Sequence, residues 1–191
     1  DVVLTWELTD AVTRPALGLP VVLVSHTRSW RPTSLGAVTH LAAVSSVAAE
    51  PLRPFGDVTV IPSGISLDRT VPVRSRQEVR RSLGYGELVP IVLVVAQRAY
   101  RKNLEFAAKA VSEFDRSAVC LLVGGCCGDD RVQQLASRYR NLRLVGHTDY
   151  VGDYVAASDV LLQLSEHEGY GNSIVEAWAA GLPVVAEQQA G

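Results

Sequence analysis

Residues 165–185 read SEHEGYGNSIVEAWAAGLPVV, and they follow an apolar run at 159–164 that reads as one buried strand. The first part of the quoted stretch carries two glycines and is typical of a loop. Ser173 followed by Glu176 has the spacing of a capping box, which predicts that a helix begins there. A second apolar run follows at 183–186. This order of strand, loop, helix and strand predicts a βαβ unit of a parallel sheet.

The rest of the chain repeats this alternation of short apolar runs and amphipathic stretches. Most runs are continuous rather than alternating, which is typical of parallel strands covered on both faces. We expect strands at 2–5, 20–25, 41–44, 58–61, 90–96, 118–123, 142–145, 159–164 and 183–186. Cap residues predict helices from Ser75 to Gly84, over 104–114 after Asn103, over 131–139 after Asp129 or Asp130, and from Ser173 to Gly181. The predicted fold class is α/β, with Rossmann-like doubly wound parallel sheets.

The segment from Ile61 to Pro72 interrupts the alternation with proline, glycine and polar residues, which favours a crossing between two domains. We therefore divide the chain into residues 1–62 and 63–191. The second part holds about five βα units, enough for one doubly wound layer, whereas the first holds only about three or four strands.

The charge of the chain is close to balanced. Among 191 residues, 18 Lys and Arg stand against 20 Asp and Glu, so the formal charge is −2. This balance argues against an electrostatic grip on nucleic acid or on an anionic membrane surface. The hydrophobic share of 48% supports a large buried core, and no apolar run approaches the roughly 18–20 residues of a membrane span. We expect no nucleic-acid partner and no membrane-spanning segment.

The three cysteines are Cys120, Cys126 and Cys127, an odd number without Cys-x-x-Cys spacing. This pattern favours small core or turn residues in a reducing compartment, and hence a cytoplasmic protein. The sequence contains no Asp-x-Asp motif and no set of His and Cys with ligand spacing, so we expect no metal site.

The loop and helix start in the quoted stretch are the first candidate site. In an open parallel sheet, ligands bind beyond the carboxyl ends of the strands, and a helix start offers unpaired N–H groups to an anion. Gly169 and Gly171 would let the backbone approach a phosphate. Glu168 and Glu176 could accept hydrogen bonds from vicinal hydroxyls of a sugar. The alternatives are a solvated loop acid for Glu168 and the capping box with Ser173 for Glu176.

A basic turn is the second candidate site. Residues 97–103 read QRAYRKN and lie between the strand expected at 90–96 and the helix that follows. In a parallel sheet this position puts Arg98 and Lys102 at the same edge as the glycine loop. There they could neutralise a diphosphate as it leaves a sugar. The alternative is a solvated surface turn.

The pattern Glu-Gly-Tyr-Gly-x4-Glu-Ala-x3-Gly-x-Pro-Val-Val at 168–185 resembles the Glu-x7-Glu signature of retaining GT-B glycosyltransferases, the large bacterial family of group 1 glycosyl transferases. Four further segments are similar to family segments and follow the family's order. They are 18–27, like the strand and histidine late in its N-terminal domain, 60–66, like its VIPNGVD crossing, 101–103, like its basic turn, and 144–146, like the end of its FLG strand. The resemblance covers nearly the whole chain.

This resemblance implies a GT-B protein with two Rossmann-like domains. Residues 1–62 would be the C-terminal part of the acceptor-side domain, and 63–191 the donor-binding domain, truncated at its end. The implied reaction moves a sugar from a nucleoside diphosphate sugar, with UDP or GDP as the nucleotide, to an acceptor with retention of anomeric configuration. No cofactor or metal is implied. The implied acceptor is a glycan, a lipid-linked molecule or a small molecule.

The resemblance also assigns roles to residues at matching positions. Four residues would be catalytic. Glu168 would contact the hydroxyls of the transferred sugar, and His26 would lie beside that sugar. Lys102 and Arg98 would stabilise the diphosphate. Glu176 would hold the ribose diol. The remaining donor-binding positions are the backbone of Gly169, Tyr170, Gly171, Asn172 and Ser173 at the phosphates, and Gly146 and Thr148 at the base.

Two departures from the family pattern matter. Arg98 precedes Lys102 by four positions, where the family's arginine precedes its lysine by five or six; either Arg98 still reaches the diphosphate, or Gln97 occupies that place and one cation is missing. The family's N-terminal glycine-rich loop, most of its acceptor domain and its C-terminal crossing helix are absent. We expect the fragment alone to lack turnover and to be poorly soluble, and any peripheral membrane contact to involve the missing N-terminal part.

Two other functions stay open. A nucleotide-sugar epimerase on the same scaffold would form its product without an acceptor. A non-catalytic GT-B partner subunit would keep the fold with a degraded phosphate clamp, and the short spacing from Arg98 to Lys102 favours it.

Overall fold

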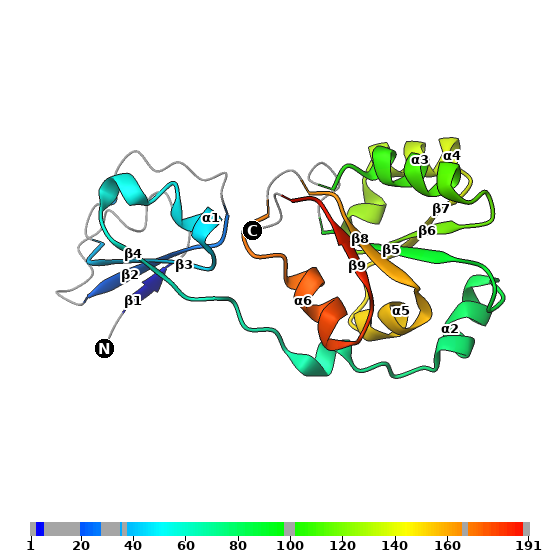
Figure 1. Ribbon diagram of the computed structural model, residues 1–191, viewed down its shortest axis with the longest axis horizontal. Helices are drawn as coiled ribbons and strands as arrows, with labels where there is room; N and C mark the ends of the chain where they lie inside the picture. The colour runs from blue at the N-terminus through cyan, green and yellow to red at the C-terminus, as the bar shows by residue number, and fades with distance from the viewer. Residues whose placement is uncertain are drawn as a thin grey trace. The chain divides into compact units, whose positions relative to one another are not determined.

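The computed structural model of the chain describes residues 3–5, 20–27, 35, 38–97, 102–165 and 168–188 (Figure 1). Contacts between residues divide the chain into two units. The first unit holds the described residues up to Gly64 together with 168–171, and the second holds 65–165 together with 172–188. The two units are described separately below.

The second unit is built on a five-stranded parallel sheet with the strand order β7-β6-β5-β8-β9. Its strands are β5 (Ile91–Val95), β6 (Val119–Val123), β7 (Leu142–Gly146), β8 (Val160–Gln163) and β9 (Val184–Ala186). Each coincides with an expected strand to within a residue or two. Every residue of β6 is buried, because this strand has neighbours on both sides and helices on the sheet. The continuous apolar runs therefore predicted buried parallel strands correctly.

In the described part of this unit, five helices accompany the sheet: α2 (Arg76–Leu83), α3 (Leu104–Phe114), α4 (Asp130–Arg138), α5 (Val151–Ala157) and α6 (Asn172–Ala179). Two short 3₁₀ helices join them, η3 (Leu67–Thr70) and η5 (Gly125–Gly128). In Figure 1, α3 and α4 cover one face of the sheet, and α5 and α6 cover the other. Among the described residues, no helix has the length and apolar character needed to cross a membrane.

The caps show why two of these helices begin and end where they do. Ser75 accepts a hydrogen bond from the Glu78 N–H, and the Glu78 carboxylate accepts one from the Ser75 N–H at 2.8 Å. Gly84 ends α2 with a positive φ of 82°. Asp129 caps α4 by accepting from the Arg131 N–H at 2.8 Å. The predictions of a capping box at Ser75 and of an aspartate cap for α4 are confirmed.

Of two other cap predictions, one is confirmed in position only and the other is wrong. Asn103 precedes α3 as expected, but its side chain makes no cap hydrogen bond, and its backbone is left-handed with φ 44°. Ser173 is not the N-cap of α6, because the helix already begins at Asn172. Its hydroxyl instead donates to the side-chain oxygen of Gln163 at 3.3 Å, so the capping box expected with Glu176 does not form. The carboxylate of Glu176 is therefore free of that role.

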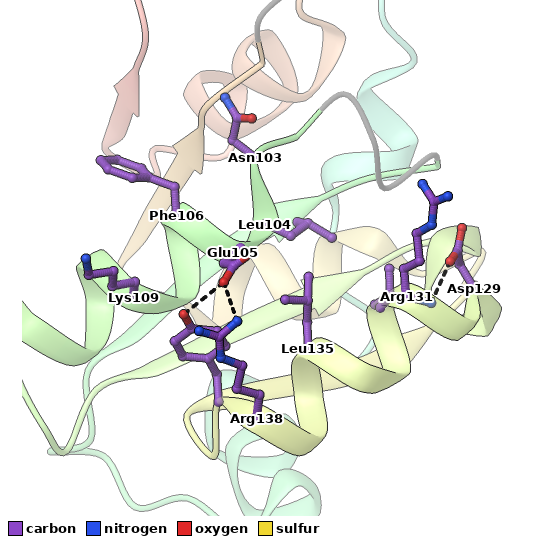
Figure 2. A pocket seen from close by; sticks show the side chains of 11 residues that line it. Asn103, Leu104, Glu105, Phe106, Lys109, Asp129, Arg131, Leu135 and Arg138 are labelled. Atoms are coloured by element: carbon purple, nitrogen blue, oxygen red, sulfur yellow. Dashed lines mark hydrogen bonds and ion pairs between the residues drawn. The ribbon is translucent and has the colours of Figure 1, made fainter.

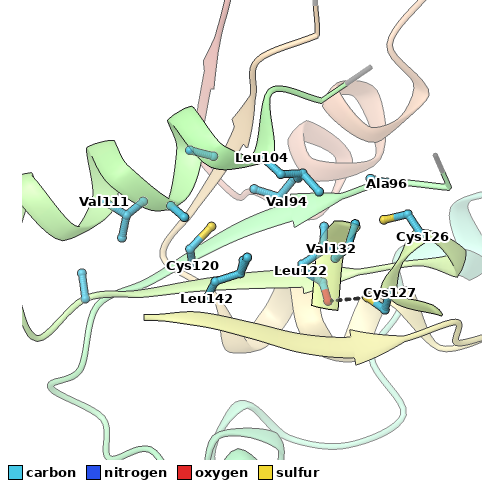
Figure 3. Close-up of a cluster of buried hydrophobic side chains, with 13 residues drawn as sticks. Val94, Ala96, Leu104, Val111, Cys120, Leu122, Cys126, Cys127, Val132 and Leu142 are labelled. Atoms are coloured by element: carbon cyan, nitrogen blue, oxygen red, sulfur yellow. Dashed lines mark hydrogen bonds between the residues drawn. The ribbon is translucent and has the colours of Figure 1, made fainter. Parts of the chain in front are cut away.

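The core between the sheet and the helices α3 and α4 contains all three cysteines (Figure 3). Cys120 lies in β6, and burial raises the pKa of its thiol to about 12. Cys126 and Cys127 lie in η5 and are buried without a disulfide. The expectation of small core and turn residues is confirmed.

The order of the strands shows where the direction of winding changes in the second unit. From β5 the chain proceeds to β6 and β7 on one side, and then returns to place β8 and β9 on the other side of β5. The connections after β5 and β8 therefore leave the sheet toward opposite faces and open a gap at their carboxyl ends. This switch point between β5 and β8 is where a ligand is expected.

The first unit holds a four-stranded parallel sheet in the order β1-β2-β3-β4. Its strands are β1 (Val3–Thr5), β2 (Val21–Ser25), β3 (His40–Ala43) and β4 (Val58–Val60), and it also contains α1 (Ser46–Ala49) and the 3₁₀ helix η2 (Arg53–Phe55). All four strands were expected from the apolar runs. Parallel sheets in both units, with helices alternating with the strands of the second, confirm the α/β Rossmann-like fold class.

Candidate functional site

Several of the expected site residues lie at the carboxyl edge of the five-stranded sheet. Lys102 follows β5 and stands two residues before α3, Gly146 ends β7, and Asn172 and Ser173 form the first turn of α6 after β8. Because the strands are parallel, the connections that carry these residues leave the sheet at one edge. The structure thus places the connections that carry these second-unit residues along one edge of the sheet.

Glu176 is the most unusual polar group in this region. It lies in α6 with its side chain only 10% exposed, and its carboxylate lies 3.7 Å from the guanidinium of Arg69. Among the described residues, the carboxylate of Glu176 makes this ion pair and no hydrogen bond. A buried carboxylate normally accepts several hydrogen bonds, because desolvation without them costs several kcal/mol. The oxygens of Glu176 therefore retain capacity to accept hydroxyl donors from a ligand.

A series of hydrogen bonds between buried or partly buried side chains holds the start of α6 against the end of β8. Gln163, the last residue of β8, is fully buried; it accepts from the Ser173 hydroxyl and donates to the Ser165 hydroxyl at 3.1 Å. This series fixes the first turn of α6 over the end of β8. The first N–H groups of a helix have no acceptor within it, so the anchored turn offers a fixed set of donors to an anion.

Gly146 and Thr148 form the connection after β7. Gly146 has a positive φ of 96°, and its carbonyl accepts from the N–H of Gly124 at 2.8 Å. Thr148 accepts from the N–H of Tyr150 at 3.0 Å. Gly124 was not among the expected residues. It has φ 139°, and a Cβ at this position would collide with the carbonyl of Ala96, so only glycine lets the connections after β5 and β6 approach so closely.

The loop at 168–171 belongs to the first unit. Gly169 is buried, and a Cβ there would collide with the backbone of His26 at the end of β2. The hydroxyl of Ser45 donates to the Gly169 carbonyl and also accepts from the Ala48 N–H at 3.1 Å as the cap of α1. Close packing on His26 therefore gives Gly169 a structural reason to be glycine, in addition to the phosphate approach that the sequence suggested.

The other residues of this loop are also placed. Tyr170 packs on the buried alanine cluster of β3 and α1, and Gly171 has a positive φ of 82° immediately before α6. Glu168 is half-buried beside Gly169, and the side chain of His26 is exposed. The expected residues thus fall into two groups: His26 and 168–171 in the first unit, and Lys102, Gly146, Thr148, Asn172, Ser173 and Glu176 in the second.

Part of the basic turn lies outside the described residues. This holds for Arg98, which was expected to clamp the diphosphate, and for Arg101. Gln97, the alternative to Arg98, is exposed at the end of the described segment. Within the described ranges, no three or more His, Cys, Asp or Glu side chains gather as a metal site.

A pocket of about 680 Å³ lies elsewhere, between α3 and α4 (Figure 2). Glu105 spans it, accepting from the guanidinium of Arg138 at 2.7 Å and from the hydroxyl of Tyr139 at 3.2 Å. None of the expected site residues lines this pocket.

In a comparison with known families, residues 89–191 match the model described as glycosyl transferases group 1. Among individual proteins, the D-inositol 3-phosphate glycosyltransferase of Streptomyces avermitilis is 30% identical over 172 residues, which is 79% of this chain and 37% of that protein. The N-acetyl-alpha-D-glucosaminyl L-malate synthase of Bacillus anthracis is 29% identical over 81% of this chain and 41% of its own length. The chain therefore spans well under half of these two relatives.

Solved structures share the fold. HepE of Anabaena in complex with UDP superposes with a TM-score of 0.78 at 19% identity, over 99% of this chain and 60% of that one. A glycosyltransferase from Rickettsia africae superposes with a TM-score of 0.77 at 19% identity, over 100% of this chain and 58% of that one. At such identities the likeness establishes the architecture that both sheets indicate.

Proposed function

The chain belongs to the group 1 glycosyl transferases, and from this premise we propose that it forms the donor side of an enzyme that moves a sugar from a nucleoside diphosphate sugar to an acceptor. In this proposal the configuration at the anomeric carbon is retained. Residues 63–191 bind the donor, and residues 1–62 are part of the acceptor-side domain. The acceptor is a glycan, a lipid-linked molecule or a small molecule, and the enzyme works in the cytoplasm.

The observation that carries the proposal is the buried carboxylate of Glu176 in α6, the helix that follows β8. It lacks hydrogen-bond donors among the described residues, and a ribose offers two adjacent O–H donors at the spacing of a carboxylate. Its place in α6, one turn after the anchored start of the helix, fits a nucleotide whose phosphates lie at the helix start and whose ribose lies farther along.

The reaction requires groups that stabilise the charge on the diphosphate and groups that position the sugar. The bond between the anomeric carbon and the β-phosphate oxygen breaks, the acceptor oxygen bonds to the anomeric carbon, and the acceptor proton leaves with the diphosphate. Lys102, Arg98 and the N–H groups at the start of α6 stabilise the negative charge that develops on the diphosphate. No divalent cation is needed for this role in the proposal.

Glu168 and His26 act on the sugar. Glu168 accepts hydrogen bonds from the hydroxyls of the transferred sugar, and His26 lies beside that sugar. The close packing of Gly169 on the backbone of His26 supports this pairing, because Glu168 directly precedes Gly169 in the chain. Gly146 and Thr148 line the base pocket after β7.

The test is release of nucleoside diphosphate by the full-length protein, with UDP-, GDP- and ADP-sugars as donors. Lys102→Ala and Glu168→Ala should each lower turnover at least about 100-fold, the usual effect of removing one group that stabilises the transition state. Glu113→Gln, an exposed glutamate of α3, is the matched control and should be unchanged. Undiminished turnover in both site variants would refute the assignment of these residues.

Further measurements separate the parts of the proposal. The anomeric configuration of the product, read by NMR, decides retention against inversion. Turnover that survives EDTA supports the absence of a metal requirement, and turnover abolished by EDTA contradicts it. Product formed without an acceptor would indicate an epimerase. Donor binding without turnover, seen as a thermal shift, would indicate a non-catalytic partner subunit.

A further inference from the structure

Arg69 approaches the buried carboxylate of Glu176 from outside the sequence motif. It lies in η3, at the end of the segment that crosses between the two parts of the chain. Its Nη1 lies 3.7 Å from Glu176 Oε1, and the side chains are 56% and 10% exposed. The guanidinium of Arg69 therefore meets solvent, whereas the carboxylate of Glu176 is buried.

The backbone that carries Arg69 is held firmly. Gly152 of α5 packs so closely on η3 that a Cβ there would lie 2.8 Å from the carbonyl carbon of Thr70. The Thr70 hydroxyl donates to the Leu67 carbonyl at 2.7 Å and closes the 3₁₀ turn. Just beyond η3, Asp153 of α5 accepts from the backbone N–H of Val73 at 2.7 Å. The start of the Arg69 side chain is thus fixed relative to α5.

The distance between the two charged groups suits an indirect role. At 3.7 Å the guanidinium attracts the carboxylate without a hydrogen bond, so it does not occupy the lone pairs that a ligand would use. Attraction from one side restricts the carboxylate to one orientation. A preoriented acceptor binds a diol better than one that must first be ordered.

We propose that Arg69 is a positioning residue for the donor: it orients the carboxylate of Glu176 and thereby sets the affinity for the ribose of the nucleotide. This inference rests on the proposed function, because it takes Glu176 as the ribose acceptor. It adds a determinant of nucleotide affinity in the crossing segment, outside the 168–185 motif.

The experiment measures binding of nucleoside diphosphates to the full-length protein by calorimetry. The probe is whichever of UDP, GDP and ADP binds the wild type most tightly, together with its 2′-deoxy counterpart. Hydrogen bonds to a charged acceptor predict that the wild type prefers the ribonucleotide by about 10- to 100-fold. Arg69→Gln should weaken the ribonucleotide by about 10-fold and the 2′-deoxynucleotide by much less, so that the preference falls to a few-fold.

Variants of both partners distinguish positioning from general damage. Arg69→Lys keeps the charge and should restore most of the preference. Glu176→Gln should lose the preference, and adding Arg69→Gln to it should have little further effect, since both act through one carboxylate. Lys109→Gln is the matched control: Lys109 is similarly exposed and lies 3.9 Å from Glu113, an exposed carboxylate, and its removal should change nothing.

The outcomes separate the two levels of the account. If Glu176→Gln keeps the preference, the assignment of Glu176 as ribose acceptor is wrong, and so is the proposed site. If Glu176→Gln loses the preference but Arg69→Gln keeps it, the ribose site stands and the role of Arg69 is refuted. Equal weakening of both nucleotides by Arg69→Gln would also refute it, because a merely structural role would produce that result.

Discussion

Asp153 should be essential to the stability of the second unit. Its side chain is 2% exposed, and its carboxylate accepts three hydrogen bonds: from the Val73 N–H at 2.7 Å, the Arg74 N–H at 2.9 Å and the Arg74 Nε at 2.8 Å. Replacement by asparagine removes the charge and turns an N–H₂ group toward at least one of these donors. The connection from η3 to α2 would lose its attachment to α5.

The size of the effect follows from these contacts. Losing one charge-assisted hydrogen bond costs about 1.5–3 kcal/mol, and the remaining bonds to a neutral oxygen are weaker. The guanidinium of Arg74 is 42% exposed and can regain water, which keeps the loss below the 3–5 kcal/mol typical of fully buried pairs. We expect Asp153→Asn to lower the free energy of unfolding by about 2–3 kcal/mol.

Urea unfolding of the full-length protein, followed by circular dichroism, measures this loss. With a denaturant slope of about 1–3 kcal/mol per molar, the midpoint of the second unit should fall by roughly 1 M. Asp149→Asn is the matched control, because Asp149 is 89% exposed and its variant should keep the wild-type midpoint. A midpoint for Asp153→Asn equal to that of the control would show that these three hydrogen bonds do not stabilise the second unit.

Three further predictions concern acid stability and two glycines. Burial alone would raise the pKa values of Asp153 and Asp159, but the N–H and guanidinium groups around them lower both pKa values. The stability that the two carboxylates add should therefore be present above the unfolded pKa of about 3.9 and should be lost as pH falls through the folded pKa values. Urea midpoints measured from pH 6 to pH 2 should show this fall, and Asp153→Asn should flatten it; a wild-type midpoint that rises toward acid would contradict the sign. Gly124→Ala should destabilise the second unit by about 3 kcal/mol or more, because the new Cβ would collide with the carbonyl of Ala96 and the φ of this residue is positive. Gly128→Ala is the control and should shift the urea midpoint little, because the space around Gly128 is open. Gly169→Ala should displace the loop that carries the proposed sugar-binding glutamate. The variant should therefore show a lower kcat even at temperatures well below its thermal midpoint, and an unchanged kcat would show that the loop position is irrelevant to turnover.

The sequence predicted the elements that depend on local pattern. The nine strands among the described residues all follow from apolar runs. The reason is clearest for β6, because a parallel strand that is buried on both faces must be apolar along its length. The start of α2 follows from Ser75 and Glu78, whose mutual hydrogen bonds involve residues only three positions apart. Such features need no knowledge of the rest of the fold.

Features that depend on distant packing could not be predicted in this way. Ser173 has the spacing of a cap, but the buried side chain of Gln163 on β8 binds its hydroxyl, and the helix begins one residue earlier. Arg69 stands more than a hundred positions before Glu176, and nothing in its neighbourhood signals the contact. The need for glycine at 124 arises from the approach of β5, which only the folded sheet reveals.

Binding of a nucleoside diphosphate sugar at the switch point between β5 and β8 can be measured by amide hydrogen exchange. The full-length protein is compared with and without a saturating donor sugar. The donor should slow exchange at the start of α6, over 172–175, and around the start of α3, at 102–104, and should leave the last turn of α4 unchanged. Protection confined to the pocket between α3 and α4, or none at the start of α6, would contradict binding at the switch point.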